Sequence, residues 1–211
     1  MAKGKLRRSA EVAEVQEVAQ EAVQIEERNK IFQKFELKEI VFIAILSAVL
    51  ILTCSIMAFV ADLTKVIFAI GQVATALQMS FFVTVGLIRV RKVGTVTLIM
   101  LFMGAIMVMM SPVMFLSNIF VLLLVELLAI VIFKGYKSDK ACYMAGLIIA
   151  PLSIITPTVY NAIVYPEIFE AITSNIYMAV GMSAVVVVFG FIGATVGLKV
   201  ARELIKAGVL K

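Results

Sequence analysis

The sequence predicts an all-α integral membrane protein with six transmembrane helices, and three observations carry that prediction. Of the 211 residues, 63% are hydrophobic, and the mean hydropathy is +1.09. Globular chains are about half apolar, so this composition indicates a bilayer as the solvent. Six apolar segments approach the roughly 20 residues that a spanning helix needs. The basic residues cluster in every second connection. The six segments are 37–60, 65–88, 93–110, 115–133, 141–164 and 175–198.

A polar, charged extension precedes the first segment. Residues 9–35 contain no Gly or Pro and are rich in Ala, Glu and Gln, which favours helix. Nothing here resembles a cleaved secretion signal. We therefore expect a cytoplasmic helical extension, 1–36, before a transmembrane domain, 37–211. A weak Val/Ala stripe leaves two interpretations open, a solvated or interfacial helix and a docking helix for a cytoplasmic partner.

Small residues mark the first segment. Ala44 and Ala48 are four residues apart, so they lie on one helix face among large apolar neighbours. Small residues at this spacing let another helix approach closely. The second and third segments, which a basic stretch at 89–92 connects, complete the first half of the bundle.

Glu126 is the one carboxylate deep within a predicted span, in the fourth segment. Its burial in lipid costs on the order of 2.5–3.5 kcal/mol on insertion scales, so we expect it to face protein or a cavity. One interpretation is a ligand or ion contact. The other is an interhelical hydrogen bond, to Thr95, Thr97, Gln78 or Ser183.

The last two segments carry Pro and Gly. Pro151 and Pro157 remove backbone donors from the fifth span, so carbonyl oxygens there need other partners or a cavity. The connection 164–175 is long enough for a short helix after Pro166. Gly190, Gly193 and Gly197 predict close packing of the sixth span inside the bundle, and this helix continues into the charged tail.

The distribution of charge predicts the orientation. The chain holds 19 Lys and Arg residues, and all except Lys65 fall in residues 1–39, the second and fourth connections or the tail. Positive loops remain cytoplasmic, so both termini are expected inside the cell membrane. The net charge of +5 reports this orientation, and nucleic-acid binding is not expected.

The composition argues against an enzyme. There is no His, and no second carboxylate lies deep within a span with Glu126, so intramembrane protease chemistry has no residues to perform it. No phosphate-binding Gly-rich loop precedes a Lys, so ATP hydrolysis would belong to another subunit. We expect no catalytic residue, metal ligand or cofactor.

Amides and phenols gather at the outer ends of four segments. Such a ring suits a pocket for a small polar ligand, although interfacial Tyr and Asn also lie at headgroup level without binding anything. With Glu126, the candidate substrate-binding residues are Gln72, Asn118, Tyr160, Asn161, Asn175 and Tyr177.

The order of several stretches resembles the substrate-binding S component of an energy-coupling factor (ECF) transporter, in particular its Trep-Strep-like branch. The similar stretches are "LKEIVFIAILSAVLIL", "RKVGTVTLIMLFMGAI" and "NIFVLLLVELLA", and the resemblance covers about 37–205. It implies six helices, an outward-facing pocket for a vitamin or other micronutrient, and docking through Ala44 and Ala48. The implied partners are a transmembrane coupling subunit and two ATPase subunits. The extension and the absence of Trp depart from the family pattern, and the substrate is not specified.

Two other classes remain open. One is a stand-alone secondary transporter or channel that uses Glu126 as a proton or cation site. The other is a structural or regulatory membrane protein that works through its N-terminal helix.

Overall fold

The computed structural model describes residues 33–63, 70–110, 112–174 and 176–208, and these segments are helical apart from short connections. The chain divides into two compact units, 1–34 and 35–211. The predicted N-terminal helix lies outside the described residues. Everything below concerns the second unit.

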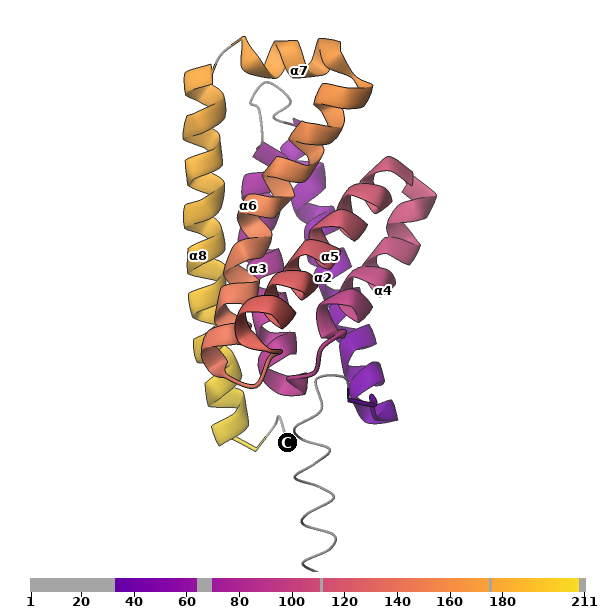
Figure 1. Ribbon diagram of the computed structural model, residues 1–211, viewed down its shortest axis with the longest axis vertical. Coiled ribbons are helices and arrows are strands. Elements are labelled where there is room, and N and C mark those ends of the chain that lie inside the picture. The colour runs from indigo at the N-terminus through magenta and orange to yellow at the C-terminus, as the bar shows by residue number, and fades with distance from the viewer. Residues whose placement is uncertain (1–32, 64–69, 111, 175, 209–211) are drawn as a thin grey trace, which may run out of the picture. The chain divides into compact units, whose positions relative to one another are not determined.

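Seven helices make up the described part of this unit (Figure 1). They are α2 (Leu37–Leu63), α3 (Ile70–Val90), α4 (Thr95–Met110), α5 (Pro112–Phe133), α6 (Asp139–Val164), α7 (Pro166–Thr173) and α8 (Ile176–Lys206). The all-helical prediction is confirmed for this part of the chain. Helix α7, with Pro166 in its first turn, is the short helix predicted in the last outer connection. Helix α8 continues to Lys206, as the sequence indicated.

Three of the described helices contain stretches long and apolar enough to cross a membrane, namely Leu37–Ile56, Asp139–Thr156 and Ile176–Lys206. Shorter apolar stretches occur in the other three long helices, at Thr75–Val90, Thr95–Ile106 and Ile119–Phe133. The outward faces of these helices carry large apolar side chains, such as Leu52, Val131 and Val188, that are more than half exposed. This pattern is compatible with a protein whose outer surface contacts lipid.

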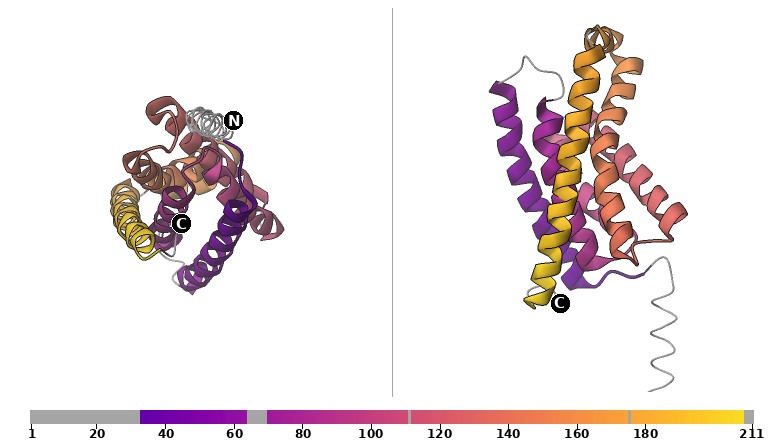
Figure 2. Two further views of the ribbon diagram at one scale, coloured as in Figure 1. Left: turned by 90° about the horizontal axis from the view of Figure 1, so that it is seen from below. Right: turned by 90° about the vertical axis from the view of Figure 1, so that its left-hand side faces the viewer.

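Helix α3 lies at the centre of the bundle. It packs most extensively against α8, and then against α6 and α2 (Figures 1 and 2). Helices α4 and α5 form an adjacent pair that joins α2 to α6. Much of the core consists of branched side chains at these contacts, including Ile43, Leu87, Ile99, Val125 and Ile149. The result is a bundle in which α3 is covered by neighbours while α2 lies at the edge.

Glycines let α8 approach α3 at backbone distance, which confirms the close packing predicted from Gly190, Gly193 and Gly197. All three are buried. A Cβ on Gly193 would lie 2.2 Å from the Leu77 carbonyl oxygen, and one on Gly197 would lie 2.7 Å from the Phe81 carbonyl oxygen. Backbone atoms cannot move aside cheaply, so a side chain larger than Gly is incompatible with this contact.

Candidate functional site

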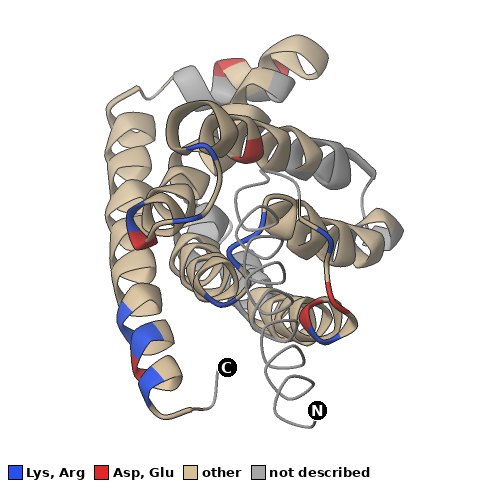
Figure 3. Ribbon diagram, turned by 60° about the horizontal axis from the view of Figure 1, so that its bottom comes forward, with Lys and Arg blue, Asp and Glu red and all other residues tan. Residues whose placement is uncertain are grey.

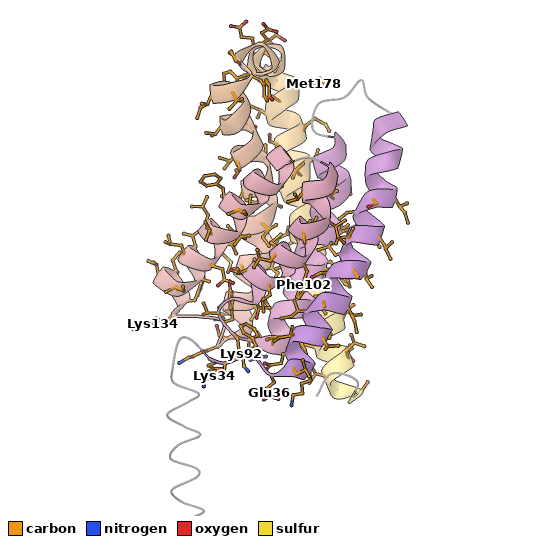
Figure 4. The ribbon with its side chains drawn as sticks, turned by 90° about the vertical axis from the view of Figure 1, so that its right-hand side faces the viewer. Lys34, Glu36, Lys92, Phe102, Lys134 and Met178 are labelled. Atoms are coloured by element: carbon orange, nitrogen blue, oxygen red, sulfur yellow. The ribbon has the colours of Figure 1, made fainter. Side chains whose placement is uncertain are left out.

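Basic residues mark one end of the bundle (Figure 3). Figure 4 labels Lys92, Glu36 and Lys134 at this end and Met178 at the opposite one. We call them the basic end and the outer end. The α3–α4 and α5–α6 connections and the end of α8 lie at the basic end, while α7 lies at the outer end (Figure 1).

The predicted polar ring is described only in part. Gln72 is in the first turn of α3, Asn118 in the second turn of α5, and Tyr160 and Asn161 near the end of α6, so their backbones belong to outer helical turns. The structure does not describe these four side chains or any part of Asn175. Tyr177, in the first turn of α8, is 89% exposed. Its phenol therefore faces the surroundings of the bundle.

Glu126 lies in a different place from the polar ring. Its side chain is 6% exposed and reaches from α5 to the first turn of α4. The backbone N–H of Gly94 donates to Oε1 and Oε2, at 3.0 and 3.1 Å. The N–H groups of Val96 and Thr97 donate to Oε1, at 3.1 and 3.3 Å. The carboxylate thus caps the N-terminus of a neighbouring helix.

This arrangement satisfies two needs at once. The first N–H groups of a helix have no partner within it, and the helix dipole favours negative charge at that end. A buried carboxylate, in turn, requires donors. Of the two interpretations of Glu126, the interhelical hydrogen bond describes its contacts, and among the partners expected it is Thr97, through its backbone N–H, that participates. The structure does not bring Glu126 together with Tyr177.

The α3–α4 connection is held in one conformation by its surroundings. Gly94 has φ +95°, in the left-handed region that favours glycine, and a Cβ there would lie 3.3 Å from the Phe35 ring. Arg91 also has a positive φ, at 51°. The Thr95 hydroxyl donates to the Lys92 carbonyl at 2.7 Å. These features aim the N–H groups of Gly94, Val96 and Thr97 at Glu126.

A second carboxylate holds the same connection from the side of α2. Lys92 Nζ lies 2.7 Å from Glu39 Oε2, and both side chains are nearly buried, at 13% and 10% exposure. Glu39 Oε2 also accepts the backbone N–H of Glu36 at 2.7 Å, as the third residue of a capping box does. The Lys92 ammonium lies 5.9 Å from the centroid of the Phe35 ring. The connection is therefore anchored between α2 and α5.

The α5–α6 connection places Tyr136 beside this cap. Tyr136 is 1% exposed, and its hydroxyl has no hydrogen-bond partner among the described residues. Burial raises the pKa of the phenol well above its ordinary value, and the nearby Glu126 charge raises it further. Tyr136 therefore remains a neutral phenol next to the cap.

An ion-pair cluster joins three further helices at the basic end. Asp139, the first residue of α6, accepts from Arg91, which follows α3. Its other oxygen accepts from Arg202 of α8, whose Nε and Nη2 lie 3.1 and 2.8 Å away. Two guanidinium groups therefore share one carboxylate, and the cluster keeps a positive charge.

The two alanines of α2 differ in exposure. Ala48 is exposed, whereas Ala44 is half-buried at the flank of the helix. Ala48 lies between Ile45 and Leu52, which are 61% and 66% exposed. Because the exposed stripe also contains Leu37, Val41 and Ile56, one face of α2 is left without a neighbouring helix among the described residues.

Neither the Lys92–Glu39 pair nor the Asp139 cluster was expected from the sequence. The local signal for the first is the Glu36-x-x-Glu39 spacing at the start of an apolar helix, with the basic pair Arg91–Lys92 before a Gly. Asp139 begins an apolar helix, and three lysines lie near it in the sequence, so the sequence alone indicates a solvated carboxylate. Its partners Arg91 and Arg202 are identified only by the fold.

The described residues form an all-helical bundle that is compatible with a membrane protein, and their ion pairs lie at the basic end. No protein-family model, curated protein or solved structure matches the chain.

Proposed function

We propose that this chain is the substrate-capture subunit of an importer of the ECF type, for a vitamin or other micronutrient. In this proposal α2, α3, α4, α5, α6 and α8 all cross the cell membrane, and both termini are cytoplasmic. Ligand enters from the outer end. The subunit then docks on a transmembrane coupling subunit that carries two ATPase subunits.

The open face of α2 is the observation that carries the proposal. A small residue, Ala48, is exposed there between large exposed side chains, at the half of the helix nearer the basic end. A partner helix can come close at such a notch, since the missing side chain leaves room for its backbone. An alanine needed only for packing within the subunit would be buried instead.

The distribution of charge supports the topology. The described Lys and Arg residues gather at the basic end (Figure 3), and Glu167 and Glu170 belong to helix α7 at the outer end. Positive connections favour the cytoplasmic side. The coupling subunit and the ATPases would therefore meet the basic end.

The contacts of Glu126 favour this function over a channel or secondary transporter built on that residue. Its two carboxylate oxygens accept four hydrogen bonds from backbone N–H groups. A proton or cation carrier must release its partners during each cycle, and here release would uncap α4.

Substitution of Ala48 tests the proposal. Ala48→Leu should leave the purified subunit folded and able to bind ligand, because the new side chain points away from the bundle. It should abolish co-purification with a coupling subunit and ATPases, and with it uptake. Ala184→Leu is the matched control, since Ala184 is exposed on α8, and it should leave the complex intact.

Ala48 is a sharper test than Ala44, because Ala44→Leu could also disturb packing against the neighbouring helices. Mass spectrometry of the small molecule retained on the wild-type subunit would identify the substrate. A stoichiometric, transporting complex of the Ala48→Leu variant would refute the docking role. Wild-type protein that purifies without any coupling partner would favour the other two classes.

A further inference from the structure

A shallow apolar groove runs between α6 and α8 on the outside of the bundle. Its volume is about 420 Å³, and apolar atoms alone line it. The lining residues are Leu147, Ile148 and Pro151 of α6 and Val187, Val188 and Phe191 of α8. Both helices contain stretches that are long and apolar enough to cross a membrane. In a bilayer that both helices cross, the groove would open toward the acyl chains rather than toward water.

Polar groups begin directly on the basic side of the groove. The hydroxyls of Tyr143 on α6 and Thr195 on α8 lie 3.3 Å apart, and the Tyr143 ring meets Phe191 edge-on, with 6.4 Å between ring centroids. This contact bridges the two helices where the groove ends. It marks a change from an apolar to a polar environment along the same seam.

Cations follow along the same helix faces. Lys140 precedes Leu147 by seven residues and Pro151 by eleven, spacings that keep all three on one side of α6. On α8, Arg202 follows Thr195 by seven residues and Phe191 by eleven, with the same consequence. Lys140 is exposed, and the Arg202 side chain is 52% exposed although it pairs with Asp139. The seam thus ends in exposed positive charge.

We propose that the seam between α6 and α8 binds one anionic phospholipid from the leaflet at the basic end. An acyl chain would occupy the apolar groove, and the phosphate would lie against Lys140 and Arg202. Seven residues of helix rise about 10 Å, which separates Lys140 from Leu147. That separation suits a headgroup and the upper part of its acyl chain.

The combination of features specifies this occupant. A helix of a partner protein would need only the groove, and the two cations at the end of the groove would add nothing to its binding. A free anion would be served by the cations alone and would gain nothing from the groove. An anionic phospholipid uses both, and cations near an anionic membrane surface attract its headgroups.

The inference depends on α6 and α8 crossing a membrane, but not on substrate capture. The test is native mass spectrometry of the isolated full-length chain, released from nanodiscs of equimolar phosphatidylglycerol and phosphatidylcholine. No coupling subunit or substrate is present, so failure of this inference and failure of the transport proposal remain distinguishable. The wild-type chain should retain one phosphatidylglycerol in preference to phosphatidylcholine.

Two variants separate the headgroup from the acyl chain. Lys140→Gln should lower the preference for phosphatidylglycerol about fivefold, since each cation near the surface contributes on the order of 1 kcal/mol. Its matched control is Lys134→Gln, an exposed lysine that follows α5, which should change little. Val188→Trp should fill the groove and reduce retention of both lipids. Its control is Ile132→Trp, at a position of α5 that is 58% exposed.

Melting temperatures within the range of the two controls would show that the variants are folded. Equal retention of the two lipids by the wild-type chain would overturn the inference, as would a Lys140→Gln effect no larger than that of Lys134→Gln. Displacement of phosphatidylglycerol by excess inorganic phosphate, with Val188→Trp behaving as wild type, would indicate a free-anion site and would also overturn it.

Discussion

Glu126 acts on its neighbours as an N-cap supplied by another helix. Its carboxylate oxygens accept backbone N–H groups of Gly94, Val96 and Thr97 from within a largely apolar environment. Hydrogen bonds to a charged group contribute more than neutral ones, at about 1.5–3 kcal/mol each, and a buried donor that loses its partner adds a further cost. The residue is therefore a structural member of the α4–α5 pair.

Glu126→Gln tests this role. An amide oxygen can accept only part of these bonds, and its NH₂ group would face backbone donors. We expect the free energy of unfolding to fall by about 1.5–3 kcal/mol, as measured by thermal or denaturant unfolding in detergent. Ligand affinity of the folded fraction should not change.

Glu167→Gln serves as the control, because Glu167 is exposed on α7 and substitution there should leave unfolding nearly unchanged. Wild-type stability combined with loss of ligand binding would instead assign Glu126 to a ligand or ion site.

At the scale of the elements, the contact between α3 and α8 depends on glycine. Gly193 leaves no room for a Cβ because the Leu77 carbonyl carbon and oxygen lie within 2.9 Å of that position. The two helices can separate only by giving up contacts along much of their length, since α3 packs more extensively against α8 than against any other described helix.

A pair of glycine substitutions on α8 separates the effect of overpacking on stability from the effect of helix propensity. Gly193→Ala should lower the free energy of unfolding by about 1–3 kcal/mol through overpacking. Gly181→Ala should be neutral or stabilising by up to about 1 kcal/mol, because nothing lies within 4 Å of its added Cβ and Ala favours helix. Denaturant unfolding of both variants provides the measurement. Equal effects at the two sites would contradict the close contact.

The charge asymmetry of the whole molecule predicts its orientation in the membrane. Connections at the basic end hold Arg91, Lys92, Lys134 and Lys137, and charged residues of that end also anchor α2, α6 and α8. In a cell these connections should stay on the cytoplasmic side. In the proposed topology the positive charge would serve both orientation and cohesion.

Reporter fusions test the proposed topology. Fusions at the N-terminus, at Gly135 and at the C-terminus should report the cytoplasm, and a fusion at Glu167 should report the outside, because a six-span chain alternates sides. Cysteine labelling at the same sites, which depends on the accessibility of the thiol and not on local charge, provides an independent control. A cytoplasmic signal at Glu167 would exclude six spans.

The sequence by itself determined the all-helical class, the positions of the long helices to within a few residues, the helix after Pro166 and the packing role of the α8 glycines. These features follow from local information: apolar length, helix period, proline at a first turn and the absence of a side chain. The spacing of Ala44 and Ala48, by contrast, suggests a face of small residues but does not show whether that face is exposed or buried. Only the positions of the neighbouring helices show that the face around Ala48 is open.

The partners of the charged residues were decided by the tertiary structure. Glu126 meets N–H groups some 30 residues away in the chain, Lys92 meets Glu39 at a separation of 53, and Asp139 meets Arg202 at a separation of 63. A carboxylate within an apolar helix needs hydrogen-bond donors. The sequence shows that such donors are required, but it does not show which residues provide them. Only the packing of α4 against α5, of α2 against α3 and α4, and of α3 and α8 against α6 brings those partners within reach.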